Sequence, residues 1–177
     1  MGRFLNKGNG KFAELAASKY FVDKTELINK LLEKDRIEKF ICNSRARRFG
    51  KSVTADMLVA YFSKGADSRE LFALLNCEKN KLFVENMNQY DTIFMDIQAQ
   101  FVQAKIKNQK PDLYIGKLLV KELKAEYPEI VSEDDTIADA LANIYNDTEN
   151  QSVIIFDEWD YPIRELDEGC QERTDYI

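Results

Sequence analysis

Two short groups of residues in this sequence could carry chemistry. The first is a basic segment that ends in Gly-Lys-Ser and consists of Arg45, Ala46, Arg47, Arg48, Phe49, Gly50, Lys51, Ser52 and Val53. Glycine lets backbone amides approach an anion, a lysine there reaches the β- and γ-phosphates of a nucleotide, and a serine hydroxyl binds Mg²⁺. The segment therefore predicts a phosphate loop of the Walker A type, with ATP as the expected nucleoside triphosphate.

The phosphate-loop pattern is incomplete, because Arg45 stands where the usual pattern has its first glycine. A lone Gly-Lys-Ser occurs often by chance, and the alternative is a solvated basic turn in which Lys51 is merely exposed. The surroundings favour phosphate, since a strand is expected before the loop and a helix after it, and such a helix N-terminus attracts anions. Arg47 and Arg48 are candidates for additional phosphate contacts.

The second group is the acidic pair Asp157 and Glu158, which follows the apolar run Val153–Phe156. In a nucleotide hydrolase the first carboxylate would hold Mg²⁺ through its water shell, and the second would polarise the attacking water. Ser52 and Asp157 are thus the candidate metal ligands, and Lys51 and Glu158 the candidate catalytic residues. The alternative is a strand that simply ends at polar residues. A phosphate loop upstream is what turns the pair into a motif of the Walker B type.

Composition excludes several other chemistries. The chain has 177 residues, no histidine and three scattered cysteines, Cys42, Cys77 and Cys170. Histidine-dependent triads, a zinc site and a disulfide framework are therefore not expected. Cys42 lies in an apolar run and is expected to be a small core residue. No run approaches the roughly 20 apolar residues of a membrane helix, and no secretory signal is visible, so we expect a reducing cytoplasm and no membrane partner.

The formal net charge of −6 is unevenly distributed. Residues 1–52 contain 13 Lys and Arg against 6 Asp and Glu, whereas residues 129–177 contain 2 against 15. The basic part includes the predicted phosphate loop, and the acidic part includes the predicted metal carboxylates. No basic face interleaved with aromatic residues is visible, so direct binding to nucleic acid is not expected.

Hydrophobic periodicity predicts short strands that alternate with helices. A helix is expected to begin near Asp23, with its carboxylate as the cap and Glu26 reaching back, and another from Gly50 to about Gly65. The remaining expected elements are helices at 79–88, 112–127 and 136–146 and strands at 37–42, 91–97 and 152–156. Asp96 follows the second of these strands, either beside the site or as a cap of the next loop.

This alternation indicates an α/β fold, in which helices cover both faces of a parallel sheet in three layers. Both chemical motifs fall at the carboxyl ends of strands, where such sheets bind their ligands. Residues 1–19 read as a loosely specified lead-in, and residues 20–177 as one domain.

Three stretches of the sequence resemble the bacterial AAA-ATPase-like, or "predicted AAA-ATPase", family of P-loop NTPases. Tyr20–Thr25 resembles the motif before the family's first helix, and Ile155–Pro162 is similar to its acidic strand end. Ser44–Ser52 looks like the family's glycine-poor phosphate loop, which generally has arginine at the position of Arg45. The likeness spans about residues 20–165. The chain departs from it at Ala46, where proline is usual and would pre-set the backbone.

The resemblance also has implications for the length of the chain. Family members continue through two more strands, one of which lies between the phosphate-loop strand and the acidic strand, and many continue into a nuclease-like domain. The resemblance therefore implies a C-terminally truncated member with an incomplete sheet. Its partner would be that further domain or another protein.

These observations support three functions of different classes. The first is Mg²⁺-dependent ATP hydrolysis, in which the chain is a hydrolase acting on a phosphoanhydride. The second is a nucleotide-binding regulatory switch with little turnover. The third is an α/β interaction domain that binds no nucleotide. A small-molecule phosphotransferase also fits a phosphate loop, although Glu158 beside Asp157 favours water as the acceptor.

Overall fold

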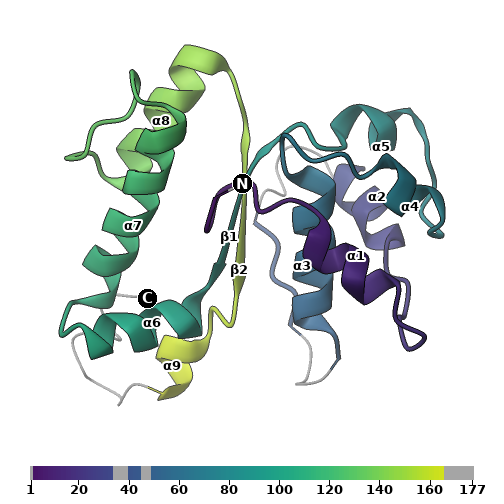
Figure 1. Ribbon diagram of the computed structural model, residues 1–177, viewed down its shortest axis with the longest axis horizontal. Coiled ribbons are helices and arrows are strands. Elements are labelled where there is room, and N and C mark those ends of the chain that lie inside the picture. The colour runs from purple at the N-terminus through teal and green to yellow at the C-terminus, as the bar shows by residue number, and fades with distance from the viewer. Residues whose placement is uncertain (1, 34–39, 45–48, 166–177) are drawn as a thin grey trace. The chain divides into compact units, whose positions relative to one another are not determined.

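The computed structural model describes residues 2–33, 40–44 and 49–165 (Figure 1). The chain divides into two compact units. The first unit is Asn6–Thr92, and the second combines Gly2–Leu5 with the residues from Ile93 onward. The predicted phosphate loop belongs to the first unit and the acidic pair to the second.

The first unit is helical and has an aromatic core. Its helices are α1 (Gly10–Ala16), α2 (Glu26–Leu32), α3 (Lys51–Phe62), α4 (Arg69–Ala73) and α5 (Lys81–Asn86). Tyr61 of α3 is fully buried, and its ring lies 4.8 Å from that of Phe83 and 5.6 Å from that of Phe72. Phe12 of α1 stacks on Phe72 of α4, with the ring centroids 5.6 Å apart. α1 also packs against α3 (Figure 1). Offset and edge-to-face ring pairs of this kind add to the free energy of burial.

The C-terminal end of α3 is fixed by the side chain of Asn88. Its amide nitrogen donates to the carbonyl oxygens of Ala60, Tyr61 and Ser63, at 2.9, 3.2 and 3.0 Å. Its amide oxygen accepts from the backbone N–H of Ser68 at 3.0 Å. The last carbonyls of a helix have no partner within the helix, and the Asn88 side chain adds to the bonds that the Ser68 hydroxyl donates to Ala60 and the Asn88 backbone N–H to Tyr61, both at 2.7 Å. The helix that follows the phosphate loop is thereby held at its far end.

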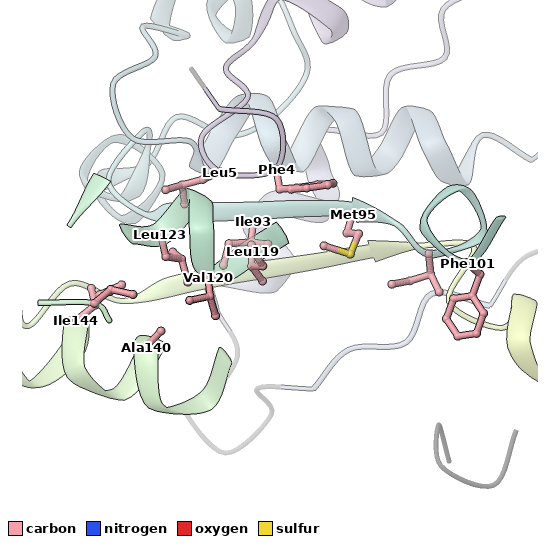
Figure 2. Packing of buried hydrophobic residues seen from close by; sticks show 12 residues of the cluster. Phe4, Leu5, Ile93, Met95, Phe101, Leu119, Val120, Leu123, Ala140 and Ile144 are labelled. Carbon is pink, nitrogen blue, oxygen red and sulfur yellow. The ribbon is translucent and has the colours of Figure 1, made fainter. Parts of the chain in front are cut away.

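The second unit is built on a two-stranded parallel sheet. Its elements are β1 (Asp91–Asp96), α6 (Ile97–Ile106), α7 (Pro111–Glu126), α8 (Ile137–Thr148), β2 (Ser152–Asp157) and α9 (Tyr161–Glu165). Ile93 and Met95 alternate along β1 and share one face of it, where they pack with apolar residues of α7 and α8 (Figure 2). The core of this unit is mainly aliphatic.

The N-terminal segment is part of the core of the second unit. Phe4 and Leu5 are 4% and 3% exposed, and Leu5 forms an antiparallel bridge to Ile93 of β1. The carboxylate of Glu122 in α7 accepts both of their backbone N–H groups at 2.9 to 3.1 Å. The residues from Gly2 to Leu5 thus add to the edge of β1, although the sequence predicts no element there.

The structure confirms most of the predicted elements. β1 and β2 match the strands expected at 91–97 and 152–156, and α3, α5, α7 and α8 match four of the five expected helices. The fifth is α2, which begins later than expected. The mixed order of helices and strands, with a parallel strand pair, is compatible with an α/β fold. None of the described helices combines the length and the apolar character that crossing a membrane requires.

Three expectations about local structure are wrong. The helix after Asp23 begins only at Glu26, because the Asp23 carboxylate bonds the backbone N–H and hydroxyl of Thr25 instead of capping a helix. The strand expected at 37–42 lies partly outside the described residues, and its described part, residues 40–42, has no regular structure. No described strand pairs with that part, and Cys42 is exposed instead of buried in the core.

β2 is less buried than its apolar sequence suggests. Ile154 and Phe156 are 46% and 51% exposed, on the face opposite to that of Ile155. A continuously apolar strand is typical of a sheet covered on both faces. In the part of the chain that the structure describes, β1 is the only neighbour of β2 in the sheet.

Candidate functional site

The described part of the phosphate loop is a sharp turn into α3. Gly50 is the N-cap residue and adopts the left-handed conformation, with φ of 76° and ψ of 32°. Such angles cost little for glycine and much more for residues with a Cβ. The carbonyl of Gly50 accepts the N–H and the hydroxyl of Thr54, both at 3.0 Å. Lys51, Ser52 and Val53 form the first turn of α3, where the helix dipole favours an anion.

A second lysine lies at this turn. The ammonium of Lys24 donates to the carbonyl oxygen of Phe49 at 2.6 Å. A Cβ added at Gly50 would lie 3.1 Å from the Lys24 nitrogen, so this position needs a glycine for its backbone angle and tolerates little bulk beside it. The contact joins residues that are 25 positions apart in the sequence.

The residues on either side of Lys24 are held firmly. Thr25 is fully buried, and one oxygen of Asp23 accepts its N–H at 2.9 Å and its hydroxyl at 2.6 Å. The other oxygen of Asp23 accepts the backbone N–H of Asn76 at 2.7 Å. Partial burial opposes ionisation of Asp23, but the hydrogen bonds from Thr25 and Asn76 outweigh it and lower the pKa of the carboxyl below its usual value. The segment that carries Lys24 is therefore fixed to the 76–78 region.

The acidic pair lies in a tight turn between β2 and α9. Asp157 ends β2, and one of its carboxylate oxygens accepts the N–H of Glu158 at 3.0 Å. Glu158 has a φ of 50°, in the left-handed region that non-glycine residues rarely occupy. Its carbonyl accepts the N–H of Tyr161 at 3.1 Å, which closes the turn. Strained backbone of this kind is found most often where function requires it.

Arg164 in α9 holds the side chains of this turn through two ion pairs. One guanidinium nitrogen lies 2.9 Å from Oε2 of Glu158, and another lies 2.9 Å from a carboxylate oxygen of Asp160. The side chains of Arg164 and Glu158 are 29% and 30% exposed, so this pair is better shielded from water than an ordinary surface pair. Glu158 is thus oriented by a cation on the next helix.

The predicted site residues fall into three groups. Arg45, Ala46, Arg47 and Arg48 lie outside the described residues. Phe49, Gly50, Lys51, Ser52 and Val53 lie together at the start of α3 in the first unit. Asp157 and Glu158 lie together at the end of β2 in the second unit. Asp96 caps α6 by accepting the N–H of Ala99 at 2.9 Å, which is a structural role.

The donor types at the two motifs suit Mg²⁺. Hydroxyl and carboxylate oxygens are the hard ligands that Mg²⁺ prefers, and it commonly takes one or two of them together with phosphate oxygens and waters. Within the described residues, no three His, Cys, Asp or Glu side chains gather as a metal cage. Ser52 in the first unit and Asp157 in the second each offer an oxygen of this kind.

Comparison with known proteins identifies the family. A family model described as "Predicted AAA-ATPase" matches residues 8–175. The chain belongs to this AAA-ATPase-like family. No curated protein and no solved structure matches the chain.

Sequence reasoning missed two residues at these motifs. Lys24 lies inside Tyr20–Thr25, a stretch noted only for its resemblance to the family, and nothing local indicates which backbone group it reaches. Arg164 could have been found from its spacing, because it lies four residues after Asp160, and opposite charges at that spacing meet on a helix. That inference needed α9, which the sequence analysis did not predict.

Proposed function

We propose that this chain binds ATP with Mg²⁺ through the turn at Gly50 and the first turn of α3, and that it hydrolyses the bound nucleotide. The observation that carries the proposal is the left-handed Gly50 directly before Lys51, at a helix N-terminus whose N-cap residue has no side chain that could bond the first-turn amides. Backbone amides and a positive helix end at such a place suit a phosphate. Membership of the AAA-ATPase-like family supports a nucleotide as the ligand.

In this proposal each motif has a separate task. Lys51 and the first-turn amides of α3 bind phosphate oxygens, and Ser52 offers its hydroxyl to Mg²⁺. Asp157 holds the ion through water, and Glu158 accepts the proton of the attacking water. Arg45, Arg47 and Arg48 add positive charge to the loop. The bound Mg²⁺ would neutralise charge on the transferred phosphoryl group.

The binding part is tested by Lys51→Ala and the hydrolytic part by Glu158→Gln. We expect Lys51→Ala to weaken binding of Mg·ATP by about a hundredfold, since it removes a charged contact to phosphate. We expect Glu158→Gln to keep the affinity and to lower the turnover rate by at least about a hundredfold, as it removes the base. Calorimetry and a phosphate-release assay measure the two effects. Unchanged binding in Lys51→Ala would leave only the interaction-domain function.

A regulatory switch with little turnover is the second candidate. It is favoured by the ion pair between Arg164 and Glu158, because a carboxylate held by a guanidinium is not free to turn toward an attacking water. Unchanged turnover in Glu158→Gln, with binding intact, would support this function over hydrolysis.

The proposed function also has implications for the layers of the fold, the partner and the cellular compartment. We propose a three-layer P-loop arrangement, whose output depends on a protein partner or on a further domain such as a nuclease-like one. We also propose that the protein works in a reducing cytoplasm, because its two described cysteines are free.

A further inference from the structure

The segment Tyr20–Thr25 contains a charged residue that the proposed chemistry does not use. Lys24 is exposed, yet its ammonium is directed to the phosphate turn and bonds the Phe49 carbonyl at 2.6 Å. The contact lies entirely within the first unit and joins two described segments. It brings a second lysine next to the left-handed Gly50.

Hydrogen bonds and burial fix the main chain on both sides of Lys24. Asp23 is fixed by three hydrogen bonds from Thr25 and Asn76, and Thr25 is fully buried. Further along α2, Asn29 donates to the carbonyl of Glu78 at 2.8 Å. The base of the Lys24 side chain therefore has little freedom, and only the side chain itself has to be ordered.

The free energy of the bond to the Phe49 carbonyl is too small to account for the ordering of the Lys24 side chain. Ordering a lysine side chain costs conformational entropy. A hydrogen bond from a charged donor offsets that cost, but less so where water competes for an exposed group. The bond to Phe49 therefore contributes little net stability. An ammonium has three donors, so one can hold the carbonyl while the others meet an anion.

We propose that Lys24 is a positioning residue and a second cation of the phosphate site. It fixes the Phe49–Gly50 turn through the Phe49 carbonyl, and so aligns the first-turn amides of α3. It also adds positive charge beside those amides, where it favours the β- and γ-phosphates of ATP over adenosine. The inference rests on the proposed function in taking ATP as the ligand.

The experiment compares Lys24→Met and Lys24→Arg with the control Lys30→Met. Lys30 lies on α2, the helix that follows Lys24, is also exposed, and forms a surface pair with Glu26 at 3.5 Å. We expect Lys24→Met to weaken binding of Mg·ATP by about tenfold, the loss of one charged contact. Lys24→Arg should keep most of the affinity, and Lys30→Met should stay within about twofold of the wild type. Binding of adenosine should be equal in all of them.

A second measurement separates this inference from the proposed function. Without nucleotide, hydrogen exchange of the Thr54 amide, which bonds the Gly50 carbonyl, should be faster in Lys24→Met than in Lys30→Met, because the turn before α3 loses its tether. If the wild type binds ATP and Lys24→Met binds it equally well, the inference is overturned whatever the exchange shows. If the wild type binds no ATP, the proposed function fails, and exchange decides alone. Faster exchange then retains Lys24 as the tether of the loop, and unchanged exchange removes that role.

Discussion

Two turns of the molecule can be compared: the phosphate turn, Phe49–Gly50 before α3, and the acidic turn, Asp157–Asp160 before α9. Both reverse the direction of the chain just before a helix, but they do so with different residues. Each has one residue with positive φ, Gly50 at 76° and Glu158 at 50°. The phosphate turn uses glycine, which tolerates this conformation at little cost. The acidic turn places a glutamate there, which costs about 1 kcal/mol or more.

The two turns also differ in how a cation holds them. Lys24 bonds a backbone carbonyl of the turn, that of Phe49. Arg164 pairs with the side chains of Glu158 and Asp160, which are charged groups of the turn itself. Under the proposed function, the cation at the first turn supports the binding of an incoming anion, whereas the cation at the second turn orients a carboxylate. Affinity should therefore respond to changes at the first turn and turnover to changes at the second.

The largest expected effect is on affinity, from Gly50→Ala. The new Cβ would force a left-handed angle on alanine and would lie 3.1 Å from the Lys24 nitrogen, so the turn has to shift. Misaligning two or more charge-assisted contacts to phosphate should weaken Mg·ATP binding by roughly a hundredfold. Calorimetric titration with Mg·ATP measures the change.

Gly65→Ala is the matched control for this substitution. Gly65 also has positive φ, 78°, and follows the other end of α3, but a Cβ there meets nothing within 4 Å. Both variants should lose about 1 kcal/mol of unfolding free energy in urea, from backbone strain alone. Only Gly50→Ala should lose affinity. Equal affinity of the two variants would show that the Gly50 turn is not part of the nucleotide site.

Elements whose formation depends on neighbouring residues in the sequence were predicted better than contacts between distant residues. β1 and β2 were predictable as short apolar runs between turns, and α8 from its pattern and from Thr136, which caps it together with Asp139. α4 was not predictable, because five residues carry too little periodicity. The Lys24 contact depends on the tertiary fold, since it joins residues 25 positions apart.

The acidic turn also has some features that the sequence predicts and others that depend on the tertiary fold. The sequence predicted Asp157 and Glu158 as a strand-end pair, because carboxylates after an apolar run are visible in the order of residues. It could not predict the left-handed backbone at Glu158, since glutamate has no preference for it. Nor could it predict that Ile154 and Phe156 are exposed, because exposure depends on which strands lie beside β2.

The next effect is on turnover, from Arg164→Gln. This variant keeps a polar side chain but removes the ion pair that holds Oε2 of Glu158, so the carboxylate loses its fixed orientation. We expect the turnover rate to fall by about tenfold while the affinity for Mg·ATP is unchanged. The free energy of unfolding should change by less than about 1 kcal/mol, because the pair is only partly shielded. Steady-state phosphate release and calorimetry give the two constants.

Two further variants show whether this effect is specific. Arg69→Gln breaks a more exposed pair, between Arg69 and Asp67 at 2.6 Å, and should leave turnover unchanged. Arg164→Lys keeps a positive charge and should restore part of the rate. A rise in turnover in Arg164→Gln would mean that the pair restrains Glu158, and would favour the regulatory switch. A fall in affinity would remove the division of tasks between the two turns.

The smallest expected effect is on stability, from Asp23→Asn in the support of the phosphate turn. Hydrogen bonds from Thr25 and Asn76 depress the pKa of Asp23 in the folded chain below its ordinary value of 3.8. A depressed pKa contributes stability that is present above the unfolded pKa and lost as the pH falls through the folded pKa. Asp23→Asn should therefore lower the unfolding free energy at pH 7 by about 1 kcal/mol, and the difference should shrink below about pH 4. Urea unfolding at pH 7 and at pH 3 measures it. The same deficit at both pH values would mean that the shape of the side chain, and not its charge, supports the segment that carries Lys24.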